Sequence, residues 1–216
     1  MPRRRRGGQE RQDRPDVFVN IPYDEKFEKQ YLAYVAGLSA FGFVPRATLE
    51  LRTSIRRLDR ILALIKSCRY AIHDLSRVEL DKTPPRTPRF NMPFELGLSV
   101  AWGRFGSRAH SWFVYEAEDF RLAKSLGDLG GTDVYIHDGR IDGVFRELCN
   151  AFVRMRRQPS VQQMWRIYRD IRNSLPGILR TAGARSPFEA RAFRDICVVA
   201  KESAERHVVP RGATFS

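Results

Sequence analysis

The sequence predicts an α/β fold, a flavodoxin-like sheet of five parallel strands in the order 2-1-3-4-5 with helices on both faces and a helical extension at its C-terminal end. Two observations lead to this prediction. Short β-rich segments alternate with amphipathic helical segments over residues 15–157, which is typical of strand-helix-strand units. After residue 157 the apolar residues recur only at helical spacing. A chain of 216 residues is long enough for one such domain and the extension.

The first three strands and two helices follow one another in alternation. The opening segment DVFVNIP is rich in β-branched and aromatic residues, and the helical segment after it ends before Gly42, a residue typical of helix ends. Strands are expected at residues 16–22, 43–47 and 69–75, and helices at residues 25–41 and 54–67.

The same alternation continues to residue 156, and the chain then becomes helical. A helix over residues 91–102 precedes strands at 110–115 and 132–137, with helices at 119–126 and 142–156. Two further helices are expected, one from residue 161 to a stop at Pro176-Gly177 and one from a cap at Ser186 to about residue 206. This pair is expected to pack on the domain or on another protomer.

Glu95 is the first candidate for a functional residue. It is the single ionisable side chain between Arg89 and Trp102, in the stretch RFNMPFELGLSVAW. Burying an unpaired carboxylate costs on the order of several kcal/mol, so this charge must face a cavity, a partner or water. Asn91, Glu95 and Ser99 recur every four residues and form one polar stripe on an otherwise apolar helix. The alternative interpretation is an acid in the first helical turn, capped by Asn91.

Polar residues at the ends of the first and third strands are expected to meet Glu95. In open parallel sheets a ligand binds beyond the carboxyl ends of the strands, where the strand order reverses. The loops NIPYD and DLS reach that point, although each of their residues could instead cap a turn or pack. The candidate catalytic residues are Glu95 and Asp74, and the candidate substrate-binding residues are Asn20, Pro22, Tyr23, Asp24, Ser76, Asn91, Phe94 and Ser99.

Missing motifs disfavour several classes of protein. No GxGxxG follows the first strand and no GxxxxGK[ST] occurs, which argues against dinucleotide-binding Rossmann and P-loop chemistry. Cys68, Cys149 and Cys197 are odd in number and widely spaced, and the four histidines lack ligand spacing. We therefore expect no metal and no cofactor, and the cysteine usage fits a reducing, cytoplasmic location.

The positive charge is concentrated at the two ends of the chain. The formal net charge is +13, and residues 1–14 hold six arginines against two acids while residues 151–216 hold thirteen basic residues against five acidic ones. Residues 1–14 are expected to be a disordered basic tail, before a domain at 15–157 and a helical extension at 158–216. With no apolar run after the arginines, no membrane partner is expected. Such a basic tail is most often solvated and less often binds nucleic acid, which is a possible partner here although no recognition motif occurs.

Three segments resemble the nucleoside 2-deoxyribosyltransferase-like families and the related TIR-like domains of bacterial defence proteins. They are VFVNIPYDEKF, IKSCRYAIHDLSR and FNMPFELGLSVAW, within residues 16–137, and the DLS and ELG motifs are the more specific ones. The resemblance implies that Glu95 attacks or stabilises the anomeric carbon of a ribosyl group and that Asp74 orients the nucleoside or ribose. The family's usual tyrosine before ELG is Phe94 here and the opening reads IPYD, so substrate contacts are expected to differ.

The function expected from these residues is cleavage of an N-glycosidic bond. Such cleavage passes through an oxocarbenium-like ribosyl cation, which a carboxylate beside C1' stabilises or captures. The prediction is an N-glycosidase or ribosyltransferase-type enzyme acting on a nucleotide, nucleoside or NAD, and the resemblance implies an antiphage defence effector that works as a homo-oligomer or with a defence-complex partner. The alternatives are a non-catalytic nucleotide-sensing or assembly module of TIR-like fold and a nucleic-acid-associated protein that uses its basic tails.

Overall fold

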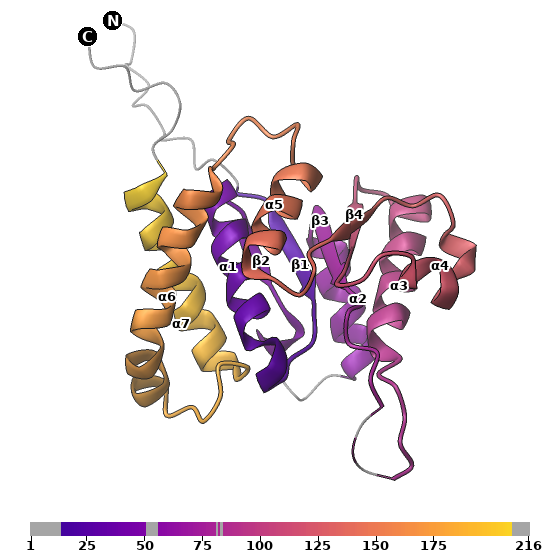
Figure 1. Cartoon of the computed structure of the whole chain (residues 1–216), viewed down its shortest axis with the longest axis horizontal. Coiled ribbons are helices and arrows are strands. Elements are labelled where there is room, and N and C mark those ends of the chain that lie inside the picture. Colours follow the sequence, from indigo (N-terminus) through magenta and orange to yellow (C-terminus); the bar gives the residue numbers. More distant parts are fainter. Residues whose placement is uncertain (1–13, 51–55, 81, 83, 209–216) are drawn as a thin grey trace, which may run out of the picture.

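A five-stranded, all-parallel sheet forms the centre of the molecule in the computed structural model, which describes residues 14–50, 56–80, 82 and 84–208 (Figure 1). The spatial order is β2-β1-β3-β4-β5, with parallel pairing between each pair of neighbours, so the predicted fold class and strand order are confirmed. The strands are β1 (Asp16–Asn20), β2 (Val44–Arg46), β3 (Tyr70–Asp74), β4 (Ser111–Glu116) and β5 (Val134–Ile136).

Different helices cover the two faces of the sheet. Successive residues of a strand point to opposite faces, so neighbouring residues pack against different helices. On one face, Phe18 and Ala71 pack with α2 (Arg57–Ser67) and α3 (Asn91–Phe105). On the other face, Val19 and Ile72 pack in the main core with α1 (Glu28–Phe41) and α5 (Ile141–Ala151). The short helices are η1 (Glu25–Phe27), η2 (Thr48–Glu50), α4 (Arg121–Ser125) and η3 (Gly127–Leu129).

The two C-terminal helices form a further layer outside α1. Figure 1 shows α6 (Val161–Ala182) and α7 (Ala190–His207) side by side against α1, on the side away from the sheet. Every residue of α1 from Tyr31 to Phe41 is buried, because the helix lies between the sheet and this pair. The extension therefore packs on the domain and shares its core.

The predicted end of the first C-terminal helix at Pro176-Gly177 is wrong. Helix α6 continues through both residues to Ala182 and ends at Gly183, which adopts a left-handed conformation (φ 61°). The apolar face also continues, because Leu175, Ile178 and Ala182 are buried with the rest of the helix. Burial of this last turn outweighs the loss of one backbone hydrogen bond at the proline.

Other helix boundaries also differ from the expected ones, and two of them have a clear cause. Helix α7 starts at Ala190, after a turn in which the Glu189 carboxylate accepts hydrogen bonds from the backbone amides of Arg185 and Ser186. Helix α5 ends at Ala151, well before the predicted residue 156, because the Gln158 side-chain amide donates to the carbonyls of the turn that follows. The expected start of the second helix at residue 54 lies outside the described residues.

We expect Pro176→Ala to stabilise the protein, because the proline is exposed and a helix interior disfavours it by up to about 3 kcal/mol relative to alanine. Gly177→Ala should add roughly 0.5–1 kcal/mol, since a Cβ there meets nothing within 4 Å. Chemical denaturation of the parent and each variant measures both changes. A fall in stability on either substitution would show that the native residue itself is required at that position of α6.

The first described residue, Arg14, contacts the helical layer. Arg14 Nη2 lies 2.7 Å from Glu205 Oε1 of α7, so residue 14 contacts the folded body. The rest of the expected disordered tail, residues 1–13, lies outside the described residues, as do residues 209–216 of the extension. Within residues 14–50, 56–80, 82 and 84–208, no helix is long and apolar enough to cross a membrane.

Candidate functional site

A cavity of about 390 Å³ opens at the carboxyl end of β1, next to the starts of α2 and α3. Three separate segments bring its walls together, as expected where the strand order of a parallel sheet reverses. The loop after β1 supplies an apolar and aromatic wall, α2 and the segment before α3 each supply an arginine, and the first turn of α3 supplies the rest. The lining residues are Ile21, Pro22, Tyr23, Arg57, Arg89, Asn91 and Met92.

Glu95 lies one turn beyond Asn91 and Met92 on α3 and is almost fully buried, at 2% exposure. Its ion-pair partner in the described part of the chain is Arg57, whose Nη2 is 4.0 Å from Glu95 Oε1. The Arg57 side chain is itself 66% exposed. Burial raises the pKa of Glu95 to about 7, and the charge of Arg57 offsets this only in part. Glu95 therefore titrates near neutral pH at the edge of an arginine-lined cavity.

The alternative interpretation of Glu95, an acid in a first turn capped by Asn91, is wrong. Asn91 is the first residue of α3, and Phe90 precedes it as the N-cap without a side-chain hydrogen bond. The polar stripe faces inward at Glu95 and Ser99, both buried, and Ser99 Oγ has no hydrogen-bond partner within the described residues. Phe94 points the other way and is 55% exposed.

Asn20 ties α3 to the strands beneath it. The Asn20 side-chain amide lies 2.9 Å from His73 Nδ1 and 3.0 Å from the carbonyl oxygen of Met92, to which it donates. Burial lowers the pKa of His73 to about 3, with a smaller contribution from His110, so His73 is neutral and accepts the other amide hydrogen. Asn20 is thus placed to position Met92 at the cavity rather than to line it.

Asp74 and Ser76 lie on the other side of the sheet from Glu95. Asp74 shares the strand face of Ile72, which packs against α1, and it is fully buried. Its carboxylate accepts hydrogen bonds from Tyr34 Oη at 2.7 Å and from the Ser76 amide at 2.9 Å, and it lies 3.0 Å from His137 Nε2. The structure does not bring Asp74 and Glu95 into one crevice.

His137 has an aspartate and a serine as neighbours, as a catalytic histidine has. The geometry differs, because the two do not contact opposite ring nitrogens. Both Asp74 Oδ2 and Ser76 Oγ, at 3.0 and 3.1 Å, approach the same nitrogen, Nε2. Nδ1 accepts a hydrogen bond from the Gly139 amide. Burial acts to raise the pKa of Asp74, but the hydrogen bonds from His137 and Ser76 outweigh it and the pKa lies below its usual range. The cluster joins β3 to the end of β5.

The loop after β1 forms one wall of the cavity through Tyr23. It also holds a neighbouring segment of the chain through Asp24. Tyr23 lines the cavity and donates its hydroxyl to the carbonyl oxygen of Val19 at 2.9 Å, and burial raises its pKa well above the usual value. Asp24 caps η1 through the Phe27 amide. Its other oxygen lies 2.9 Å from Arg77 Nε and 3.9 Å from Arg89 Nη1. Asp24 therefore holds Arg77, which lies in the segment between β3 and α3, and it lies near Arg89 of the cavity.

Sequence reasoning missed the two arginines of the cavity. Arg57 begins α2 and Arg89 precedes α3, and in the sequence alone neither differs from an ordinary solvated charge. Their position in the sequence could have identified them. Both lie at the starts of helices that face the point where the predicted strand order reverses. In the described part of the chain, no group of three or more His, Cys, Asp or Glu side chains is arranged to hold a metal ion.

Comparison with protein-family models, with curated proteins and with solved structures finds no match for this chain.

Proposed function

We propose that the chain is an N-glycosidase or ribosyltransferase-type enzyme that cleaves the N-glycosidic bond of a nucleotide, nucleoside or NAD, with Glu95 as the reacting carboxylate. The observation that carries the proposal is a buried glutamate with a pKa of about 7, one helical turn from an arginine-lined cavity. A displaced carboxylate pKa beside a concave polar site is typical of catalytic groups.

The cavity walls fit the two halves of a nucleotide. Arg57 and Arg89 supply positive charge for phosphate oxygens, and Tyr23 with Met92 supplies an aromatic and apolar surface for a base or sugar. When phosphate draws the exposed Arg57 side chain away from Glu95, the carboxylate is left to face C1'. There it stabilises the ribosyl cation or captures it covalently.

A second candidate function is a nucleotide-sensing or assembly module without turnover. One observation favours it, because Glu95 is buried and paired with Arg57, as a structural ion pair would be. Under either function the resemblance to defence proteins suggests an antiphage effector acting as a homo-oligomer or with a partner. Tight nucleotide binding without base release by the assembled protein would favour the sensing module.

The pH dependence of base release tests the role of Glu95. We expect kcat/KM to rise with pH along a limb centred near 7, because the carboxylate acts in its ionised form. About a tenth of the enzyme is active at pH 6 and about nine tenths at pH 8. Chromatography of free base released from NAD, nucleotides and nucleosides gives the profile. A limb near 7 that falls with rising pH would make Glu95 a proton donor and contradict the proposal.

A further inference from the structure

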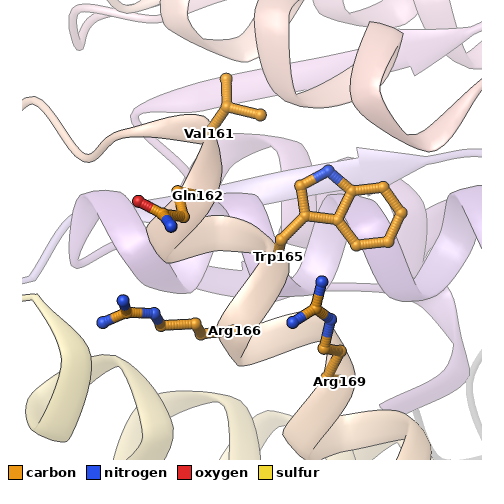
Figure 2. A pocket seen from close by; sticks show the side chains of 5 residues that line it. All are labelled: Val161, Gln162, Trp165, Arg166 and Arg169. Atoms are coloured by element: carbon orange, nitrogen blue, oxygen red, sulfur yellow. The ribbon is translucent and has the colours of Figure 1, made fainter.

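A second cavity, of about 460 Å³, lies on the outer side of α6. Figure 2 shows its side chains, all from the first turns of this helix: Val161, Gln162, Trp165, Arg166 and Arg169. Helix α6 packs on α1, so the sheet and α1 lie between this cavity and the one beside Glu95. The two cavities are therefore separate sites.

The arginines of this cavity carry uncompensated charge. Arg166 and Arg169 are exposed and form no ion pair or hydrogen bond with any described residue. The nearby acid, Asp170, is already engaged by α7, because its Oδ2 lies 2.6 Å from Ser203 Oγ and 3.2 Å from Arg206 Nη2. The region that contains the cavity, residues 151–216, holds thirteen basic residues against five acidic ones. Charge complementarity favours a polyanion here.

Trp165 gives the cavity an aromatic wall in a fixed orientation. Its ring packs edge-on against Phe145, at 5.6 Å between centroids, and against Tyr168, at 5.4 Å. Trp165 is only partly buried, and Arg169 lies one turn further along the same side of the helix (Figure 2). An anchored indole beside two free guanidinium groups matches the combination of stacking platform and phosphate contacts used on single-stranded nucleic acids.

We propose that this cavity binds single-stranded nucleic acid, with a base stacked on Trp165 and phosphates held by Arg166 and Arg169. A duplex fits less well, because its bases are stacked on one another and leave no free face for the indole. The proposal is independent of the chemistry at Glu95, since no residue is shared between the two cavities.

The first test measures binding of a labelled single-stranded oligothymidylate of about twelve nucleotides to the full chain by fluorescence anisotropy. We expect R166Q/R169Q to weaken binding at least about tenfold at low salt and to reduce the slope of log K against log salt by about 1.4. The matched control is R180Q/R191Q, which removes the same charge from exposed positions on α6 and α7 outside the cavity. The control should lose less than about threefold. Equal losses in both double variants, or no binding by the parent, would overturn the proposal.

The second test separates stacking from charge. Binding should quench the tryptophan fluorescence of the parent, and Trp165→Phe should remove most of that quenching, although Trp102 and Trp112 are still present. Circular dichroism melting establishes that the variant is folded. The proposal fails if the quenching survives in Trp165→Phe, or if a duplex of the same length binds as tightly as the single strand.

Discussion

Glu95→Gln is expected to lower the rate of base release at least about a hundredfold, because removing a carboxylate that stabilises a developing cation costs on the order of 3 kcal/mol. Glutamine keeps the size of the side chain and its place on α3, so nucleotide binding should change little. Single-turnover release of base from a saturating nucleotide measures the loss directly. The matched control is Glu116→Gln, the same exchange at a glutamate that is also 2% exposed but lies at the end of β4. Its rate should stay within about threefold of the parent.

The same variant should be more stable than the parent above neutral pH. The Glu95 pKa of about 7 in the folded state exceeds the usual 4.5, so between these values the folded protein holds a proton that the unfolded chain has released. The stability of the parent therefore falls as pH rises from 4.5 to 7, and glutamine removes this loss. Denaturation at pH 5 and pH 8 should show a relative gain for the variant of up to about 3 kcal/mol at pH 8. A variant that loses stability at pH 8 would identify Glu95 and Arg57 as a structural ion pair.

The sheet could be predicted from sequence because its signals are local and repeated. Four of the five strands carry both β-branched and aromatic residues, β2 being the exception, and the crossovers of a parallel sheet are usually helical. The end of α6 could not be predicted in the same way, because its last turn depends on burial of Ile178 and Ala182. Proline is a strong local signal, and tertiary packing overrides it here.

The candidate site could be predicted only in part. The switch-point rule places Tyr23, Asn91 and the α3 helix correctly beside one cavity. It does not say which face of the sheet a residue at a strand end will occupy, because this depends on strand register. Asp74 follows the alternation of Ile72 toward α1, whereas its neighbour His73 faces α3 with Asn20. A one-residue difference in register would have exchanged them.

Asp74→Asn is expected to destabilise the protein by about 3–5 kcal/mol, because it breaks a fully buried charged cluster. The Tyr34 hydroxyl, the Ser76 amide and His137 Nε2 all contact the Asp74 carboxylate. An asparagine amide has only one oxygen to accept their hydrogen bonds, and its NH₂ group places a donor against the other donors. Urea denaturation at pH 7 gives the change in free energy of unfolding. Asp142→Asn is the matched control, since the Asp142 side chain is 41% exposed and pairs with Arg140, and its change should stay within about 0.5 kcal/mol.

Enzyme kinetics then distinguish this structural role from the ribose-binding role that the sequence resemblance implies. Asp74 lies across the sheet from the cavity beside Glu95, so the folded fraction of Asp74→Asn should release base with a KM within about threefold of the parent. Loss of a ribose contact would instead raise KM by roughly tenfold or more while leaving stability unchanged. Tyr34→Phe adds a second measurement, because it removes one donor to Asp74 and should cost about 1.5–3 kcal/mol without touching any ligand. A raised KM in Asp74→Asn with unchanged stability in both variants would return Asp74 to the substrate site, and it would require the β3 end to reach the cavity when a ligand is bound.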